Sequence, residues 1–147
     1  HKVFVDCEED EAGKYAQYRF FAYVSSMYHK CEVVVNETIP GKSKKNHKIP
    51  IAVLHNGMYI AVGFNKPNGH AVSKKDLKKF YDIVNDVKNG EHGTQLVDAI
   101  FGSSSGFKGE ALVELEKLSK MREADPENKL NFKTANFENR IYSVTKC

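Results

Sequence analysis

Histidines are the residues of this chain best suited to proton transfer, and three of the six bracket one apolar stretch. His47, His55 and His70 lie before, within and after two apolar runs joined by Asn56-Gly57. If the loop ends brought a pair of them together beside a carboxylate, that group could act as general acid and base in RNA cleavage. The alternative is that they are scattered surface histidines, and the residues leave both interpretations open.

Lysines form the second set of candidate residues, because they gather in two short segments. The net charge of +3, from 22 basic and 19 acidic residues, is too small by itself to indicate a nucleic-acid partner. The clusters are more informative, and the predicted binding surface is Lys42, Lys44, Lys45 and Lys48 in one segment with Lys74, Lys75 and Lys78 in the other. The alternative is a solvated face that only keeps the protein soluble.

Motifs for other chemistries are absent from the sequence. It contains no Walker A, GxGxxG, HExxH, CxxC or GxSxG motif and no regular spacing of metal ligands. We therefore assign no catalytic residue, no metal site and no cofactor from motifs. No apolar run approaches the roughly 18–20 residues that a membrane span needs, so no membrane partner is predicted.

The three cysteines bear on the compartment. Cys7 and Cys147 lie near the chain ends, and a bridge between them is predicted, which would persist only in an oxidising compartment and indicates secretion. The alternative is three free thiols in a cytosolic protein. If the bridge between Cys7 and Cys147 forms, Cys31 is the unpaired cysteine of the secreted protein. The sequon Asn36-Glu37-Thr38 lies in a predicted strand and gives a weak glycosylation site at Asn36.

The elements that must position these side chains are centred on a predicted β-hairpin. Asn56-Gly57 suits a two-residue type I′ turn, because both central residues need a positive φ. The turn sets His55 opposite Met58, and regular pairing then places Val53 with Ile60 and Ile51 with Val62. Both faces of the hairpin are apolar, which indicates a central position in a sheet covered on both sides.

Hydrophobic periodicity predicts one domain over residues 1–147, of the α+β class, with helices on an antiparallel sheet. Ser73 is a predicted helix N-cap, with Asp76 three residues later. The last helix is predicted to pack through Leu112, Leu115 and Leu118 or Met121. The predicted order is a short strand (1–7), an N-terminal helix (8–30), a strand (31–39), the hairpin, an inserted helical block (73–89, 94–101 and 110–123, with a loop at 102–109), and closing C-terminal strands (130–147).

Part of this pattern resembles the small secreted fungal guanyl-specific ribonucleases and the RNase-like effectors of powdery mildew fungi. The resemblance covers residues 1–72 and the last few residues, and the helical block has no counterpart. It is carried in order by Cys7, the helix 8–30, Ile49-Pro50-Ile51, Gly57, Tyr59, Gly63, Pro67, Gly69, Val72 and Cys147. Its catalytic carboxylate falls on Lys48, its arginine falls on Ala71, and no second histidine matches. The resemblance therefore implies a non-catalytic member that uses its surface for binding.

A second resemblance is to the PD-(D/E)xK nuclease core, in which a helix precedes a β-meander and another helix follows. That element order fits residues 8–89. The metal-binding Asp of the family falls on Ile51, the Glu on Gly63 and the Lys on Asn65, so this resemblance also implies a protein without nuclease activity.

From the sequence we predict a secreted, non-catalytic binding protein of the effector type on an RNase-like scaffold. Its expected partner is a host protein, an immune receptor or RNA. One alternative is a nuclease-fold protein with a degenerate site that binds nucleic acid. The other is an RNA-cleaving enzyme that uses the histidines around the hairpin.

Overall fold

The computed structural model describes residues 9–66 and 69–137, so the predicted strand at 1–7 and most of the closing segment lie outside the described residues. The helices are α1 (Glu9–Met27), α2 (Lys74–Lys88) and α3 (Gly109–Glu123), with short 3-10 turns at Glu91–Gly93 and Pro126–Asn128. The strands are β1 (Glu32–Pro40), β2 (Asn46–His55), β3 (Met58–Lys66), β4 (Asp98–Ser103) and β5 (Asn131–Asn136).

The five strands form one sheet in the order β1-β2-β3-β4-β5. The first three pair antiparallel as a meander, whereas β4 runs parallel to β3 and β5 runs parallel to β4. The α+β class is confirmed, but the expectation of a wholly antiparallel sheet is wrong. A helix separates each parallel strand from the one before it, and such a crossover returns the chain to the same end of the sheet.

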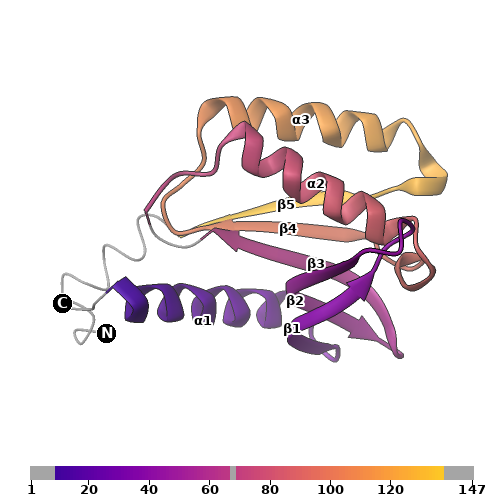
Figure 1. Cartoon of the computed structure of the whole chain (residues 1–147), viewed down its shortest axis with the longest axis horizontal. Helices are drawn as coiled ribbons and strands as arrows, with labels where there is room; N and C mark the ends of the chain where they lie inside the picture. The colour runs from indigo at the N-terminus through magenta and orange to yellow at the C-terminus, as the bar shows by residue number, and fades with distance from the viewer. Residues whose placement is uncertain (1–8, 67–68, 138–147) are drawn as a thin grey trace.

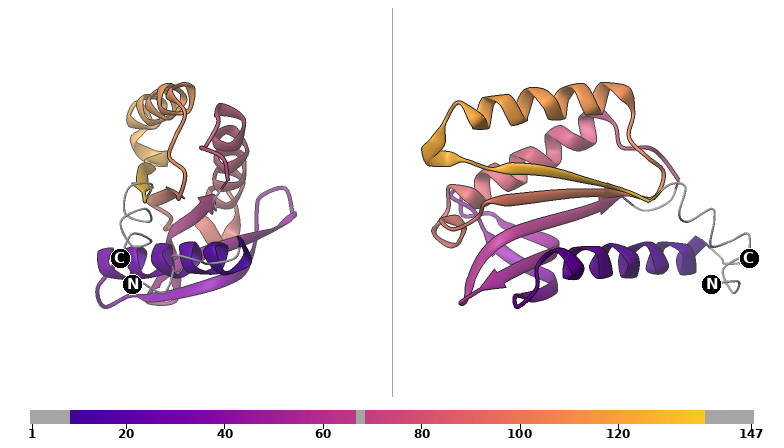
Figure 2. Two further views of the ribbon diagram at one scale, coloured as in Figure 1. Left: turned by 90° about the vertical axis from the view of Figure 1, so that its left-hand side faces the viewer. Right: turned by 180° about the vertical axis from the view of Figure 1, so that it is seen from behind.

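Helices cover both faces of this sheet (Figures 1 and 2). Helix α1 lies along one face, and α2 and α3 lie beside each other on the opposite face. The sheet is therefore the middle layer of three, as expected from the apolar residues on both sides of the central hairpin. Within the described residues, no helix is both long enough and apolar enough to cross a membrane.

Helix α2 begins and ends where its capping residues predict. The Ser73 side chain accepts a hydrogen bond from the Asp76 N–H, and the Asp76 carboxylate accepts one from the Ser73 N–H, which completes a capping box. The helix buries Leu77, Phe80, Val84 and Val87, which recur at three- and four-residue spacing. Both features agree with the sequence-based prediction.

The hairpin turn is confirmed, since Asn56 and Gly57 have φ of 53° and 79°. His55 lies opposite Met58 as predicted. Leu54 then pairs with Tyr59, which the two-residue turn also implies, but beyond this pair a β-bulge shifts the register, so Ile51 pairs with Gly63 and not with Val62. The predicted pairing is therefore wrong by one residue over most of the hairpin.

The bulge falls at Ile60, which is the extra residue on β3. Its carbonyl accepts a hydrogen bond from the Val97 N–H at 2.9 Å, just before β4 begins. The bulge is therefore accompanied by a contact between residues that are distant in sequence, and the Asn-Gly turn motif could not predict that contact.

Two separate cores result, one on each face of the sheet. The larger core, between the sheet and α2 and α3, includes Ala52, Val62, Phe80, Ala99 and Phe101. The smaller core, under α1, includes Phe20, Val24, Ile51, Val53 and Ile100. Successive strand residues alternate between the cores, as the pleat of a sheet requires.

Two predictions in the inserted block are wrong. Residues 98–101, assigned to a helix, belong to strand β4, whose six residues are all buried. A strand buried on both faces has no polar alternation, so its sequence cannot be told from a buried helix by periodicity. Helix α3 buries Ala111, Leu118 and Arg122, whereas Leu112 and Met121 are 49% and 61% exposed.

Candidate functional site

The three parallel strands end at the same edge of the sheet. Lys66 at the end of β3 pairs with Ser103 at the end of β4, and Ser103 pairs with Asn136 at the end of β5. The N-termini of α2 and α3 follow from this edge. In open sheets with parallel strands, ligands bind outside the carboxyl ends of the strands, so this edge is the first place to look for a site.

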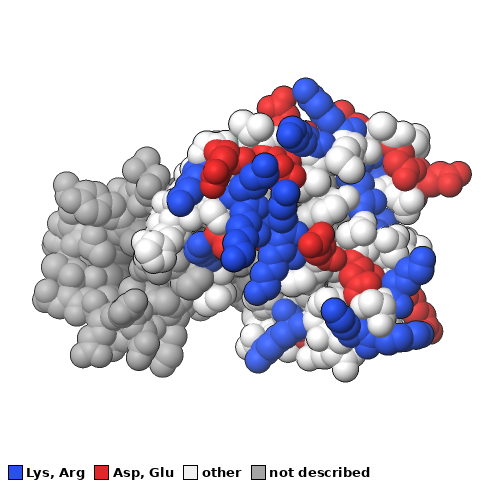
Figure 3. All heavy atoms as spheres, turned by 45° about the horizontal axis from the view of Figure 1, so that its top comes forward, with Lys and Arg blue, Asp and Glu red and all other residues white. Residues whose placement is uncertain are grey.

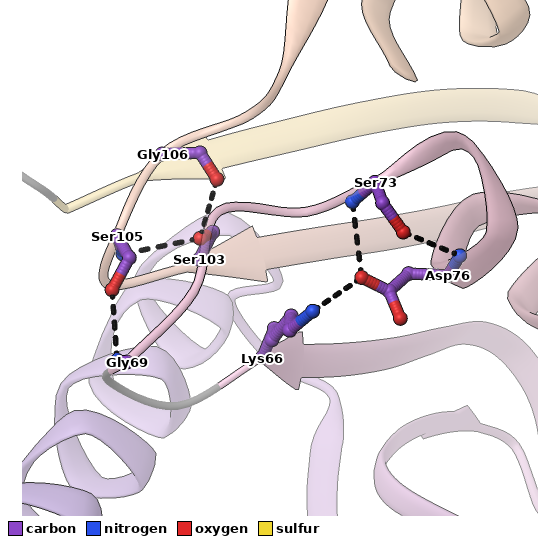
Figure 4. Close-up of polar contacts among 7 residues, drawn as sticks. All are labelled: Lys66, Gly69, Ser73, Asp76, Ser103, Ser105 and Gly106. Atoms are coloured by element: carbon purple, nitrogen blue, oxygen red, sulfur yellow. Dashed lines mark hydrogen bonds and ion pairs between the residues drawn. The ribbon is translucent and has the colours of Figure 1, made fainter. Parts of the chain in front are cut away.

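Lys66 and Asp76 form an ion pair at this edge (Figure 4). The Asp76 Oδ2 atom also accepts the Ser73 N–H at 3.0 Å, so one carboxylate oxygen links the end of β3 to the start of α2. Burial alone would raise the pKa of Asp76, but the hydrogen bonds from Lys66 and Ser73 outweigh it and lower the pKa. The lowered pKa favours the ionised form of Asp76, and its carboxylate connects the end of β3 to the start of α2.

The serine-rich segment after β4 is also tied down (Figure 4). The Ser103 hydroxyl donates to the Gly106 carbonyl at 2.8 Å and accepts the Ser105 N–H at 3.2 Å. The Ser105 hydroxyl accepts the Gly69 N–H at 3.1 Å, which fastens this segment to the loop after β3. These two hydroxyls hold loops together, and within the described residues neither is hydrogen-bonded to a histidine that would make it a nucleophile.

A cavity of about 310 Å³ lies next to the ion pair, between β3 and α2. Three of its eight lining residues are phenylalanines and three are charged. The lining residues are Phe64, Asn65, Lys66, Asp76, Lys79, Phe80, Ile83 and Phe101.

The positions that the nuclease resemblance assigns to metal chemistry lie together on the α1 face of the sheet. Ile51 pairs with Gly63, and Asn65 follows two residues along β3. The Phe20 ring of α1 packs here: a Cβ atom added to Gly63 would lie 2.9 Å from the Phe20 Cζ atom. An aromatic ring therefore fills the space beside Gly63, and none of the three positions carries a carboxylate.

Asn65 is the polar member of that group. Its side chain is 8% exposed, and neither its amide nitrogen nor its amide oxygen has a hydrogen-bond partner within the described residues. Uncompensated burial of an amide is costly, so Asn65 is an energetic weak point of the α1 face. In the described part of the chain, no group of three or more His, Cys, Asp or Glu side chains could hold a metal ion.

The predicted binding lysines fall into separate groups. Lys74, Lys75 and Lys78 lie in the first turns of α2, where basic side chains gather on the surface (Figure 3). Of the three, only Lys74 has a carboxylate partner in the described chain, Glu114 of α3 at 3.8 Å. Lys79 adds a further exposed cation to the same turns.

The loop lysines lie at the other end of α2. Lys42 donates its N–H to the Asp86 carbonyl at 2.9 Å, and Ser43 binds the Asp86 carboxylate, so the loop that also carries Lys44 and Lys45 is fastened to the C-terminal half of the helix. At 1.5 Å per residue, Asp86 lies about 16 Å along the helix from Lys75. The two basic groups are therefore distinct patches.

Lys48 lies apart from both patches. It is exposed on β2, between His47, which contacts Asp86 on the α2 side, and Ile49, which belongs to the larger core. Because side chains alternate along a strand, Lys48 faces the α1 side. The seven predicted lysines do not form one surface.

Two of the three predicted histidines, His47 and His55, lie far apart. His47 lies at the start of β2, and its Nε2 atom is 2.7 Å from the Asp86 Oδ2 atom. His55 lies at the other end of the same strand, with its Nδ1 atom 3.8 Å from the Cys31 Sγ atom. His70 is exposed in the loop after β3. His47 and His55 are thus separated by the length of β2, so these two do not form a pair.

Asp86 organises a polar cluster that sequence reasoning missed. The Ser43 hydroxyl donates to its Oδ2 atom at 2.6 Å, the Ser43 N–H to Oδ1 at 2.9 Å, and His47 completes the set. These hydrogen bonds, first from Ser43 and then from His47, lower the pKa of Asp86 to about 2. In a catalytic triad the histidine lies between the serine and the aspartate, whereas here the aspartate lies between the other two. This arrangement fixes the loop and does not activate Ser43 as a nucleophile.

A second missed cluster surrounds Asp98 at the start of β4. The Tyr28 hydroxyl donates to Asp98 at 2.6 Å, and Asn131 and Lys133 of β5 approach it at 3.2 and 3.4 Å. Burial and the bond to Asp98 raise the pKa of Tyr28. Lys133 Nζ also lies 5.6 Å from the centre of the Tyr28 ring. This cluster joins the residue that follows α1 to the start of β4 and to β5. No local motif could have found it, because its members are far apart in sequence.

The remaining predicted residues add no site. Asn36 is exposed on β1 with a φ of 52°. Cys31 is a free, half-buried thiol. The predicted disulfide partners Cys7 and Cys147 lie outside the described residues.

Comparisons with known proteins show the fold and no more. No protein-family model matches the chain, and no curated protein matches it in sequence. Among solved structures, the chain is similar to AF1548, a protein of unknown function, with a TM-score of 0.56 and 15% identity. The likeness covers 88% of this chain and 64% of that protein, so this chain spans slightly less than two thirds of its length.

Proposed function

We propose that this protein binds nucleic acid without cleaving it, through the N-terminal half of α2. The proposal rests on one observation. Lys75, Lys78 and Lys79 are exposed on neighbouring turns of one helix, and none of them has a carboxylate partner within the described residues. Unpaired lysines on one helix suit contacts to successive phosphates, which supply most of the affinity of sequence-independent binding.

The absence of cleavage follows from residue types. In the PD-(D/E)xK resemblance, hydrolysis needs two carboxylates and a lysine, and this chain has Ile51, Gly63 and Asn65 at those positions. Phe20 occupies the space next to Gly63. The observed order α1-β1-β2-β3-α2 is the order that this resemblance implied, which supports a nuclease-type scaffold for the proposed binding protein.

The test is binding of a fluorescent 20-nucleotide oligonucleotide across a series of KCl concentrations. We expect affinity to fall as salt rises, and the double variant Lys75→Gln/Lys78→Gln to flatten the logarithmic salt slope by roughly 1.4–1.8, the loss of two phosphate contacts. The control is Lys30→Gln/Lys48→Gln, which removes the same charge at two exposed lysines outside α2. Absent binding, salt-independent binding, or an equal effect of the control would refute the proposal.

A cleavage assay tests the second half of the proposal. RNA and DNA substrates are incubated with Mg²⁺ or with EDTA, and no turnover is expected in either condition. Turnover that His55→Ala abolishes would instead support the histidine enzyme that the sequence left open.

A further inference from the structure

The cavity between β3 and α2 has a preformed aromatic wall. Phe80 packs edge-on against Phe64 and Phe101, with ring centroids 4.4 Å apart in each pair. Phe80 and Phe101 are 3% and 5% exposed, so their positions are fixed by the core, while Phe64 is half-buried. A flat ring entering the cavity would therefore contact mainly the Phe64 ring, which Phe80 holds in place.

The rim of the cavity carries charge of both signs. Lys66 is neutralised by Asp76, while Lys79 has no carboxylate partner in the described chain. The sum over Lys66, Lys79 and Asp76 is one positive charge, which suits a ligand with one negative charge. The Asp76 Oδ1 atom accepts no hydrogen bond within the described residues and can take an N–H from such a ligand.

From this geometry we infer that the cavity holds one unpaired nucleotide of a bound single strand, with its base against the aromatic wall and its phosphate at Lys79. The inference rests on the proposed function and names its preferred substrate. The cavity of about 310 Å³ is at the lower end of the range for ligand pockets and admits one base. Lys79 lies one turn after Lys75 on the same face of α2, so the cavity adjoins the proposed phosphate-binding turns.

Duplex nucleic acid cannot use this cavity without extruding a base, which costs unpairing and unstacking. A single strand offers its bases freely, and aromatic side chains stack on them with little dependence on sequence. The inference therefore predicts a preference for single strands over duplexes of equal length.

The experiment compares binding of a twelve-nucleotide thymidine strand with binding of a twelve-base-pair duplex at one salt concentration. Ile83→Trp enlarges a half-buried side chain of the lining and fills the cavity. We expect the ratio of single-strand to duplex affinity to fall about 10-fold or more, the loss expected for one base–aromatic stack. Leu112→Trp is the control, because Leu112 is 49% exposed on α3 and does not line the cavity. It should leave the ratio unchanged.

Lys79→Gln is the second variant, chosen because an exposed lysine can be replaced without affecting the fold, should Ile83→Trp be unstable. It should lower single-strand affinity more than Lys75→Gln does, since only Lys79 lines the cavity. The cavity inference is wrong, and the proposed function stands, if both nucleic acids bind, Ile83→Trp leaves the ratio unchanged and Lys79→Gln weakens single-strand binding no more than Lys75→Gln does. If neither nucleic acid binds, both fail.

Discussion

Asp86 has a lowered pKa and also holds the loop between β1 and β2 in place. Its carboxylate accepts hydrogen bonds from the Ser43 hydroxyl and N–H and contacts His47. A single aspartate on α2 therefore fixes the basic loop between β1 and β2, and the folded state favours its charged form.

This cluster predicts a specific pH dependence of stability. Folding lowers the pKa of Asp86 from 3.8 to about 2, so the unfolded chain binds the proton more tightly. The stability contributed by Asp86 is then fully present above a pH of about 4 and is lost as the pH falls through about 2. The difference in unfolding free energy between the wild type and Asp86→Asn, measured by urea denaturation, should shrink across that window.

Asp82→Asn is the matched control for this measurement. Asp82 lies one turn earlier on α2, is exposed, and makes no hydrogen bond or ion pair within the described residues. Its substitution removes the same charge from α2 without removing a hydrogen bond, so the change in stability should be small. A difference for Asp86→Asn that stays constant over this range would contradict the assignment of the lowered pKa.

At the scale of elements, α1 is seated on the sheet by a ring packed over glycines. A Cβ atom added to Gly63 would lie 2.9 Å from Phe20 Cζ, and one added to Gly102 would lie 2.7 Å from Phe20 Cδ1. Glycines on two adjacent strands thus make room for one aromatic side chain of the helix. The same packing removes the space that a metal-binding carboxylate at Gly63 would need.

This packing predicts that Gly63→Ala is destabilising although alanine suits a strand better than glycine does. Overpacking a well-filled core costs about 1–3 kcal/mol, and we expect a loss in that range from chemical denaturation. Phe20→Leu should relieve the contact, so the double variant should be more stable than the sum of the single effects predicts. Gly109→Ala, at a glycine with nothing within 4 Å, is the control and should be near neutral. Additive effects of Gly63→Ala and Phe20→Leu would contradict the proposed contact.

The helices and strands also show which structural features could be predicted from the sequence. Ser73 and Asp76 predicted the start of α2 and Asn56-Gly57 predicted the turn, because each signal is local and acts on its own backbone. The register beyond the turn was not predictable, since the Ile60 bulge accompanies a hydrogen bond from Val97, distant in sequence. Strand β4 was missed because both of its faces are buried.

The candidate site was predicted less well than the fold, and the reason is again distance along the chain. The lysines of α2 were found because they are close in sequence, but Lys66 and Asp76 meet only after the chain has passed from β3 into α2. The cavity joins residues 64–66, 76–83 and 101. These three segments are far apart in the sequence and mix apolar and charged residues, so no local pattern indicates that they line one cavity.

At the scale of the whole molecule, the remaining question is the compartment, which the sequence ties to a bridge between Cys7 and Cys147. In the chain-entropy model a closed loop of about 140 residues contributes about 5 kcal/mol, so such a bridge would dominate the stability of this domain. Cys31 is a free thiol whose Sγ atom lies 3.8 Å from the His55 Nδ1 atom. It therefore serves as an internal standard for counting thiols.

The bridge predicts the number of thiols that can be alkylated in denaturant. Protein purified without reductant should take up one iodoacetamide adduct by intact mass, and three after reduction, whereas Cys31→Ser should take up none and two. Three adducts without reductant would remove the argument for secretion and, with it, the expectation of a host protein or immune receptor as partner. Nucleic-acid binding would be unaffected by that outcome, because the lysines of α2 and the cavity beside them do not depend on the chain ends. The thiol count therefore distinguishes a secreted protein with the Cys7–Cys147 bridge from a protein with three free thiols, which the binding experiments alone cannot do.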